Sequence, residues 1–318
     1  MDRIAVLTSG GDSPGMNAAI RAVARTCFFN DKECVGVLRG YEGLIDGDFI
    51  PLTRSSVGGI IHRGGTILKT ARSERFTTPE GRGEALARMR AAGIEGLVVI
   101  GGDGSFHGAR ELHEMGMPVI GIPGTIDNDV AGTDETIGFD TAVNTALEAV
   151  MRLRDTASSH DRLFIVEVMG RNAGFLALEI AVASGAEYVV VPELPLSIGN
   201  LCQRLRLSQE KGKSHTLIIL AEGVMSANEM KDKLQDTGGY DARVTVLGYI
   251  QRGGSPTSFD VLLASRMGAY AAESLLIGKS GYMVGNVNHR MVLSDLERSW
   301  SEHKSLSPEL LGLVDKLN

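Results

Sequence analysis

The sequence predicts an α/β protein with two doubly wound lobes, each built on a largely parallel sheet, and an active site in the cleft between them. Residues 96–100 and 118–122 form two continuous apolar runs, separated by one helical segment. Such runs are typical of parallel strands that are covered on both faces. The length of 318 residues exceeds the usual limit of about 250 to 300 residues for one hydrophobic core. We therefore expect two lobes.

The remaining elements follow from hydrophobic periodicity and from glycine-rich turns. Further strands are expected at residues 3–8, 33–38, 163–168, 188–191, 216–220 and 243–249. Helices are expected at residues 16–30, 80–92, 140–158, 201–209 and 259–276. Residues 39–51 are expected to be turn-rich, with a hairpin-like turn at residues 46–48. We place residues 1–138 and 251–301 in a larger lobe, and residues 139–250 and 302–318 in a smaller one.

Composition and charge limit the class of protein. The net charge of −7 and the pI near 5.6 argue against a nucleic-acid partner, which usually requires a basic face. The three cysteines form no CxxC pair and have no histidines at metal-ligand spacing, so neither a disulfide framework nor a zinc site is expected. No apolar run reaches the length of a membrane span. We expect a soluble, cytoplasmic protein without a membrane partner.

Three glycine-rich turns follow predicted strands, at residues 9–15, 101–105 and 123–129. Backbone amides in such turns approach phosphate oxygens closely, and a following helix offers its positive N-terminus. Asp103 would then lie beside phosphates, where Mg²⁺ is typically held by one or two carboxylates. Asp127 and Asp129 could orient or deprotonate an attacking hydroxyl. The pattern indicates phosphoryl transfer, although acidic residues in glycine-rich turns also cap helices or form Asx turns.

Five motifs carry a resemblance to a known family. LTSGGDSPGMNAAIR, GGDGS, PGTIDND, VMGRNAG and GYIQRGGSP occur in this order between residues 4 and 278. The sequence resembles the bacterial ATP-dependent 6-phosphofructokinases. The resemblance implies a glycolytic kinase that transfers the γ-phosphoryl group of MgATP to the 1-hydroxyl of fructose 6-phosphate, giving fructose 1,6-bisphosphate and ADP. The larger lobe would bind the nucleotide and the smaller lobe the sugar phosphate.

The resemblance also assigns roles to individual residues. It places catalysis on Asp127, Arg171, Thr125, Asp129 and Arg72, with Asp103 as the ligand of the active-site Mg²⁺. Nucleotide contacts fall on Gly11, Arg72, Ser73, Gly102, Asp103, Gly104 and Ser105. Contacts with the sugar phosphate fall on Thr125, Ile126, Asp127, Arg162, Met169, Gly170, Arg171, Glu222, Arg243, Tyr249 and Arg252.

Regulation and assembly follow from the same resemblance. It implies an effector site for ADP, GDP or phosphoenolpyruvate, formed by Arg21, Arg25, Arg54, Arg154, Gly185, Glu187, Lys211, Lys213 and His215. Glu187 would be the carboxylate for the effector's Mg²⁺. Arg162 and Arg243 would reach the sugar 6-phosphate of a neighbouring subunit, which implies a homotetramer with shared sites. From the residues alone, Arg21 and Arg25 are better explained as solvated surface. Arg162 is explained equally well as a cation at a helix C-terminus.

Two departures and two alternatives bear on these expectations. Tyr249 stands where the family has histidine, and a phenol carries no positive charge at neutral pH. Gly58 and Gly59 stand where the family has polar side chains near the effector.

A pyrophosphate-dependent phosphofructokinase is the nearest alternative, but Gly104 and Gly124 replace its aspartate and lysine and favour ATP. The other alternative is a catalytically silent sensor of nucleotides or sugar phosphates.

Overall fold

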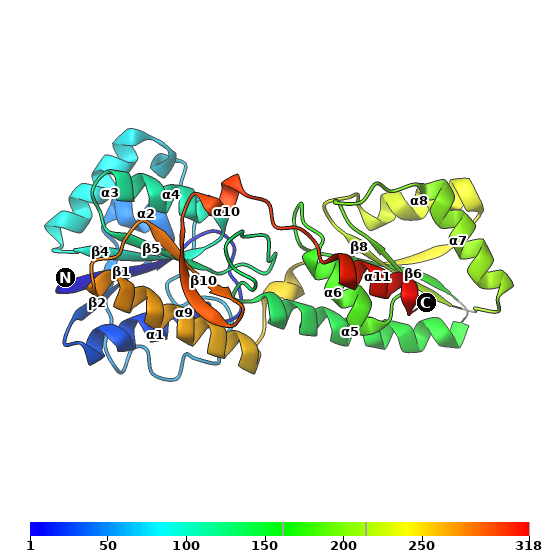
Figure 1. Cartoon of the computed structure of the whole chain (residues 1–318), viewed down its shortest axis with the longest axis horizontal. Helices are drawn as coiled ribbons and strands as arrows, with labels where there is room; N and C mark the ends of the chain where they lie inside the picture. The colour runs from blue at the N-terminus through cyan, green and yellow to red at the C-terminus, as the bar shows by residue number, and fades with distance from the viewer. Residues whose placement is uncertain (161, 214, 318) are drawn as a thin grey trace. The chain divides into compact units, whose positions relative to one another are not determined.

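The computed structural model describes residues 1–160, 162–213 and 215–317. The chain divides into two compact units, shown in Figure 1. Unit 1 comprises Met1–Ile126, Val130–Thr141 and Arg252–Lys304; unit 2 comprises Asp127–Asp129, Ala142–Gln251 and Ser305–Asn318. Each unit has its own sheet with helices packed against it. The predicted α/β class with largely parallel sheets is confirmed.

The sheet of unit 1 has the strand order β11-β10-β5-β4-β1-β2-β3. Its strands are β1 (Arg3–Thr8), β2 (Glu33–Val37), β3 (Phe49–Pro51), β4 (Gly96–Gly101), β5 (Val119–Pro123), β10 (Tyr282–Val287) and β11 (Arg290–Asp295). The five inner strands are parallel, whereas β3 and β11 pair antiparallel at the two edges. The carboxyl ends of β1, β4 and β5 therefore meet at one edge of the sheet.

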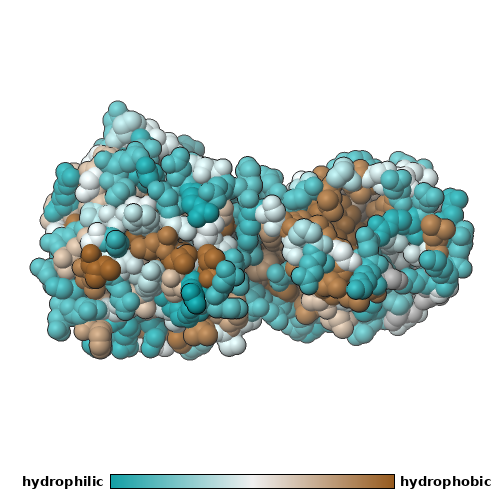
Figure 2. Space-filling view, viewed as in Figure 1, coloured by the Kyte–Doolittle hydropathy of each residue, from teal (hydrophilic) through white to brown (hydrophobic). Residues whose placement is uncertain are grey.

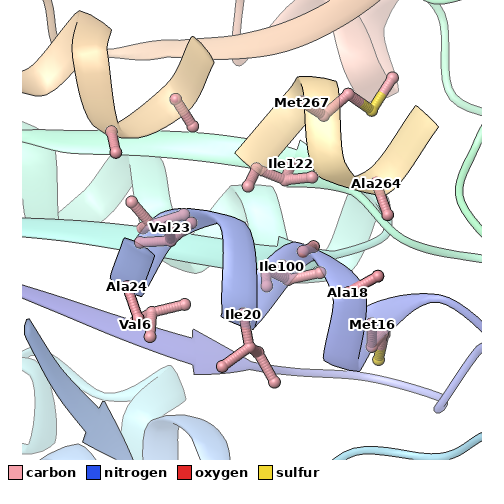
Figure 3. Packing of buried hydrophobic residues seen from close by; sticks show 14 of the residues in the cluster. Val6, Met16, Ala18, Ile20, Val23, Ala24, Ile100, Ile122, Ala264 and Met267 are labelled. Carbon is pink, nitrogen blue, oxygen red and sulfur yellow. The ribbon is translucent and has the colours of Figure 1, made fainter. Parts of the chain in front are cut away.

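Helices cover both faces of this sheet (Figure 1). They are α1 (Met16–Phe29), α2 (Gly40–Asp46), α3 (Pro79–Ala91), α4 (Asp103–Glu114), α9 (Ser258–Leu276) and α10 (Arg298–Ser301), with the 3₁₀ turn η1 (Arg75–Thr77). Alternate residues of β1 enter two cores. Val6 packs with α1 and α9, as Figure 3 shows, whereas Leu7 packs with α2, α3 and α4. A Cβ at Gly268 would lie 2.7 Å from the Ala19 carbonyl oxygen, so this glycine permits the close contact of α9 with α1.

Unit 2 has a four-stranded parallel sheet in the order β7-β8-β6-β9. Its strands are β6 (Leu163–Val168), β7 (Tyr188–Val190), β8 (Thr216–Ala221) and β9 (Ala242–Val246). Its helices are α5 (Phe139–His160), which begins in unit 1, α6 (Phe175–Ser184), α7 (Ile198–Glu210), α8 (Ala227–Gly238) and α11 (Pro308–Lys316). Helices α7 and α8 contribute Leu205 and Met230 to a core with Ile165 of β6 and Ile218 of β8.

Two local expectations are wrong, and one hairpin was missed. Residues 40–46 form helix α2 rather than turns, because Tyr41, Leu44 and Ile45 pack into the core of unit 1. The strand expected at residues 243–249 ends at Val246, and the 3₁₀ helix η2 (Gly248–Arg252) follows it. Gly248 has φ +54°, a left-handed conformation that ends the extended backbone. The hairpin of β10 and β11 was not predicted.

The surface is mostly hydrophilic on the face shown in Figure 2, with apolar patches on both units. Exposed apolar side chains include Phe29 at the end of α1, Leu262 on α9 and Leu207 on α7. Within the described part of the chain, no helix is long and apolar enough to span a bilayer. Apolar patches of this kind are candidates for contacts with other protein chains.

Candidate active site

The predicted phosphate-binding turns of unit 1 lie together at the carboxyl edge of its sheet. The Ser9 amide donates to the Ile100 carbonyl oxygen at 2.9 Å, which joins the end of β1 to β4. The Gly124 amide donates to the Gly101 carbonyl oxygen at 2.9 Å, which joins the end of β5 to β4. This edge is where open α/β sheets bind ligands. The three glycine-rich turns are thus parts of one site.

Close contacts bring five predicted residues to this edge. A Cβ at Gly11 would lie 2.5 Å from Nη1 of Arg252, so the arginine side chain rests against the glycine backbone. A Cβ at Gly102 would lie 3.8 Å from Cβ of Thr125. Ser105 Oγ fills the space beside Gly101, at 2.4 Å from the position of an added Cβ. Larger residues at positions 11 and 101 would displace these side chains.

Helix α4 points its N-terminus at the same edge. Gly102 is the N-cap residue and Asp103 is the first helical residue. One carboxylate oxygen of Asp103, Oδ1, accepts a hydrogen bond from the Gly104 amide at 2.6 Å. Apart from the neighbouring residues and backbone of its own helix, no atom of the described residues lies within 4 Å of a Cβ added to Gly104. The helix start therefore combines amide donors, a carboxylate and open space, an arrangement suited to a phosphate and its cation.

The loop that carries Arg72 and Ser73 is fixed on both sides of Arg72. Thr70 Oγ1 donates to the Gly10 carbonyl oxygen at 2.6 Å, in the first glycine-rich turn. Ser73 Oγ donates to the carboxylate of Glu42 on α2. Arg72 itself is exposed. The loop thus presents an exposed guanidinium from a backbone tied to the first glycine-rich turn.

In unit 2, Asp127 and Arg171 form an ion pair. Nε of Arg171 lies 3.4 Å from Oδ2 of Asp127, whose side chain is only 4% exposed. Arg171 has φ +52° and follows Gly170 with φ +134°, so the chain turns sharply after β6. The Arg171 amide donates to Oε1 of Glu222 at 2.9 Å. Four predicted residues, Asp127, Gly170, Arg171 and Glu222, are thereby part of one cluster.

Gln251 is a site residue that the sequence reasoning missed. Its side chain is fully buried, and its Oε1 accepts a hydrogen bond from the Met169 amide at 2.9 Å. Gln251 and Glu222 therefore hold the backbone on both sides of Gly170. A glutamine between an isoleucine and an arginine carries no sequence pattern of its own. Its position inside the GYIQRGGSP motif was the available signal.

Arg162 and Arg243 lie at the other edge of the unit 2 sheet. Arg162 precedes β6, and Arg243 of β9 is in register with Phe164 near the start of β6. Met169 follows the opposite end of this six-residue strand, which spans about 20 Å. Nη2 of Arg243 lies 3.1 Å from Oδ2 of Asp241. The structure thus separates these two arginines from the cluster of Asp127 and Arg171.

The predicted effector residues fall into two groups, one in each unit. In unit 1, Arg25 Nη2 donates to the Arg54 carbonyl oxygen at 3.0 Å, and Arg21 precedes Arg25 by one turn of α1. In unit 2, Arg154 Nη2 donates to the Gly185 carbonyl oxygen. Lys213 Nζ lies 3.5 Å from Oε1 of Glu187, whose Oε2 accepts from the Leu217 amide at 2.7 Å. Lys211 and His215 flank Lys213.

No group of three or more His, Cys, Asp and Glu side chains that could hold a metal ion is found among the described residues. Mg²⁺ bound through phosphate oxygens and water needs only one or two carboxylates. Asp103 satisfies this requirement at the start of α4. Glu187 is 5% exposed and already faces Lys213 and a backbone amide. Its role toward a metal stays a prediction.

Unit 1 carries glycine-rich turns at the carboxyl edge of a parallel sheet, and unit 2 carries a carboxylate–arginine pair. These features are typical of α/β proteins that bind phosphate groups. The sequence profile of the family described as Phosphofructokinase matches residues 3–275. The chain belongs to this family, as the motifs predicted.

Similar proteins agree with this membership. The chain is 53% identical over 318 residues to the ATP-dependent 6-phosphofructokinase of Halalkalibacterium halodurans, covering 100% of both chains. It is 54% identical over 320 residues to ATP-dependent 6-phosphofructokinase 1 of Thermus thermophilus, covering 100% of this chain and 99% of that protein.

Solved structures show the same fold. The structure of phosphofructokinase from Saccharomyces cerevisiae matches with a TM-score of 0.89 and 35% identity, over 100% of this chain and 48% of that one. The pyrophosphate-dependent phosphofructokinase of Marinobacter aquaeolei matches with a TM-score of 0.85 over 100% of this chain and 91% of that one. Its identity of 22% supports the fold alone.

Proposed function

We propose that this protein is a kinase that transfers the γ-phosphoryl group of ATP to the 1-hydroxyl of fructose 6-phosphate, giving fructose 1,6-bisphosphate and ADP. The observation that carries the proposal is full-length identity above 50% to proteins named ATP-dependent 6-phosphofructokinase. The site geometry supports it, because amide donors, arginines and carboxylates are the groups that phosphoryl transfer requires. The enzyme is a phosphotransferase with an alcohol acceptor.

Asp127 is the base in this mechanism. As the 1-hydroxyl oxygen attacks the γ-phosphorus, a carboxylate within hydrogen-bond reach accepts its proton. Arg171, 3.4 Å from Asp127, neutralises charge on the transferred group. Negative charge spreads over the equatorial oxygens in the transition state, and fixed donors stabilise it there. We assign this role to Arg171, Arg72, Thr125 and the Gly11 amide, and a supporting role to Asp129.

Mg²⁺ fits the nucleotide side of the site. Asp103 offers one carboxylate at the N-terminus of α4 and would hold the ion there together with phosphate oxygens. Bound there, Mg²⁺ would supply positive charge against the phosphates. The remaining nucleotide contacts belong to Ser73, Gly102, Gly104 and Ser105.

The choice of ATP over pyrophosphate has a physical basis at two glycines. Gly104 is exposed, with open space around its Cα, so a nucleotide's α-phosphate meets no side chain there. A Cβ at Gly124 would lie 3.0 Å from Cγ2 of Ile100, so a lysine at this position would press against the sheet. The relatives named ATP-dependent set the pyrophosphate alternative aside.

We assign the sugar phosphate to Met169, Gly170, Glu222 and Tyr249 of unit 2. Ile126 and Arg252, which belong to unit 1, are further proposed contacts. Arg162 and Arg243 lie at the opposite edge of the unit 2 sheet from Met169. Since they are the arginines assigned to the 6-phosphate, they serve the site of a neighbouring subunit. This arrangement supports a homotetramer with shared sites.

The protein is regulated in the cytoplasm by ADP, GDP or phosphoenolpyruvate. Arg21, Arg25 and Arg54 gather on unit 1, and Arg154, Lys211, Lys213 and His215 gather near Gly185 and Glu187 on unit 2. Clustered cations on a chain of net charge −7 attract anionic effectors.

A coupled assay with purified protein, Mg²⁺ and fructose 6-phosphate tests the function. We expect fructose 1,6-bisphosphate to form with ATP and not with pyrophosphate. Product from pyrophosphate alone would reverse the donor assignment. Binding of MgATP without transfer to any sugar phosphate would identify the protein as a sensor and overturn the proposed reaction.

A further inference from the structure

Helix α2 connects two elements of the nucleotide side of the site, although none of its residues belongs to a glycine-rich turn. The ring of Tyr41 stacks on Phe76, with centroids 4.1 Å apart, and its hydroxyl donates to the Ser105 carbonyl oxygen in the first turn of α4. A Cβ at Gly108 of α4 would lie 2.8 Å from Tyr41. The loop of residues 70–78 and the start of α4 therefore both pack on Tyr41.

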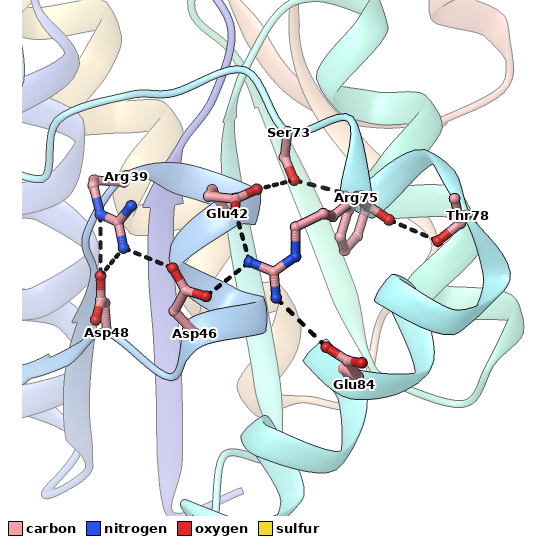
Figure 4. Close-up of polar contacts among 9 residues, drawn as sticks. Arg39, Glu42, Asp46, Asp48, Ser73, Arg75, Thr78 and Glu84 are labelled. Atoms are coloured by element: carbon pink, nitrogen blue, oxygen red, sulfur yellow. Dashed lines mark hydrogen bonds and ion pairs between the residues drawn. The ribbon is translucent and has the colours of Figure 1, made fainter.

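Glu42 ties the same loop to α2 through both of its carboxylate oxygens (Figure 4). Oε2 accepts from Ser73 Oγ, which in turn accepts from the Phe76 amide at 3.2 Å. Oε1 accepts from Nη1 of Arg75 at 2.7 Å. The hydrogen bond from Ser73, and after it the contacts with Arg75, hold the pKa of the Glu42 carboxyl below its ordinary value. Glu42 is a fixed anion beside a loop that presents Arg72.

Arg75 is held by further carboxylates on both sides of the loop. Its Nη1 also donates to Oδ1 of Asp46 at 2.9 Å, and its Nη2 lies 3.5 Å from Oε2 of Glu84 on α3. The other carboxylate oxygen of Asp46, Oδ2, accepts from Arg39 at 2.8 Å. Hydrogen bonds between ionised groups are about twice as strong as neutral ones. The loop is thus fixed by a charged network rather than by apolar packing alone.

The two anchors lie on opposite sides of Arg72 in the sequence. Thr70, two residues before it, bonds to Gly10, and Ser73, the next residue, bonds to Glu42. We propose that Glu42 is a positioning residue for the phosphate donor: it fixes the loop of residues 70–78 so that Arg72 meets the transferring phosphate. This inference rests on the proposed use of ATP. Glu42 itself touches neither ligand in this scheme.

The test is Glu42→Gln in the full chain. Glutamine keeps one acceptor for Ser73 but places an amide donor against Arg75. We expect the KM for ATP to rise by about tenfold, the size typical of losing a charged hydrogen bond, while the KM for fructose 6-phosphate changes by less than about twofold. Glu229→Gln is the matched control, because it removes one carboxylate from the exposed Glu229–Lys233 pair of unit 2, whose N–O distance is 2.8 Å. The control should leave both KM values unchanged.

Arg75→Gln removes the other partner of the Glu42–Arg75 ion pair. It also tests the proposal if Glu42→Gln does not fold. If the two residues act as a pair, the double variant should be no worse in ATP KM than the poorer single variant. An unchanged ATP KM in folded single variants, or equal increases in both KM values, would overturn the positioning role. If the unmodified protein showed no phosphoryl transfer from ATP, the proposed function itself would be overturned.

Discussion

At the scale of residues, the proposed catalytic pair is assembled from two separate sequence motifs. Asp127 comes from the turn after β5 and Arg171 from the turn after β6, and their side chains lie 3.4 Å apart. The arginine can interact with the carboxylate and with an incoming phosphoryl group, whereas the buried carboxylate is protected from bulk water. In the proposed mechanism, this arrangement assigns proton acceptance to Asp127 and charge stabilisation to Arg171.

We expect Asp127→Ser to lower kcat by about 10² to 10⁴, the usual effect of removing a general base. The affinity for MgATP should stay within about twofold of the unmodified protein, since Asp127 is assigned to the acceptor. Steady-state kinetics and equilibrium titration with MgATP measure the two quantities.

For Asp103→Ala we expect weaker Mg²⁺-dependent use of the nucleotide. Equal turnover in all three proteins would show that the site is wrongly assigned.

Tyr249 departs from the family pattern and lies on η2 with 79% of its surface exposed. This exposure rules out the simple alternative that Tyr249 packs beneath the loop of Arg252. We expect Tyr249→His to lower the KM for fructose 6-phosphate by up to about tenfold at mildly acidic pH. The reason is that histidine has an ordinary pKa of about 6.5, which a phosphate dianion raises.

The gain from Tyr249→His should shrink as the pH rises above that pKa, because the imidazole loses its charge. Tyr249→Phe is the control and should raise the KM by about two- to tenfold, through loss of one neutral hydrogen bond. A pH profile of KM for the three proteins distinguishes the outcomes. Parallel profiles would mean that residue 249 does not face the phosphate.

The motifs pointed to candidate residues for ligand contact, but not to the residues that support the loops around them. Asp103, Gly11 and Arg171 stand in glycine-rich strings whose chemistry can be read from the sequence. Glu42 and Gln251 act on the backbone of other loops, through Ser73 and Met169. Their effect depends on tertiary contacts between distant segments. A single sequence offers no local signal for such contacts.

At the scale of elements, most of the buried strands and five of the longer helices were predicted, whereas helices α2, α6, α8 and α11, strand β3 and the hairpin of β10 and β11 were not. Helix α2 has seven residues, three of its flanking or internal positions are glycine, and both of its caps are left-handed. No periodicity can be recognised over so short a segment. It is helical because Tyr41, Leu44 and Ile45 enter the core. The end of β9 was likewise determined by Gly248 rather than by strand propensity.

Helix α5 offers a test of how elements are held in place. Asp260 near the start of α9 accepts from the Gly138 and Thr141 amides, both at 2.8 Å, and from Thr141 Oγ1 at 2.5 Å. Burial raises the pKa of Asp260, yet the carboxylate satisfies the N-terminus of α5. Asp260→Asn would place an amide donor against these donors. We expect a loss of about 1 to 3 kcal/mol of stability and a lower Tm.

Asp236→Asn is the matched control for this substitution, because Asp236 is exposed on α8. It makes the same change of side chain and should leave the Tm within about 1 °C of the unmodified protein. Thermal unfolding followed by circular dichroism measures both variants. Equal Tm values for the two variants would show that the hydrogen bonds accepted by Asp260 do not stabilise the start of α5.

At the scale of the whole molecule, the sheet of unit 2 presents predicted site residues at both of its edges. Met169, Arg171 and Glu222 follow the carboxyl ends of β6 and β8, whereas Arg162 and Arg243 lie near the amino ends of β6 and β9. About 20 Å of strand separates the two sets. One chain cannot use both sets on the same sugar phosphate without rearranging its sheet. Two chains can, if each supplies arginines to the other.

Mixed oligomers test this sharing directly. Asp127→Ser lacks the base but keeps both arginines, and the double variant Arg162→Ser, Arg243→Ser lacks the arginines but keeps the base. Each should be nearly inactive alone. In oligomers that contain both, random pairing in a symmetric assembly should restore about a quarter of the sites. Co-expression with two different tags and purification over both isolates these oligomers for the fructose 6-phosphate assay. No recovery in verified mixed oligomers would show that Arg162 and Arg243 do not serve the active site of a neighbouring subunit.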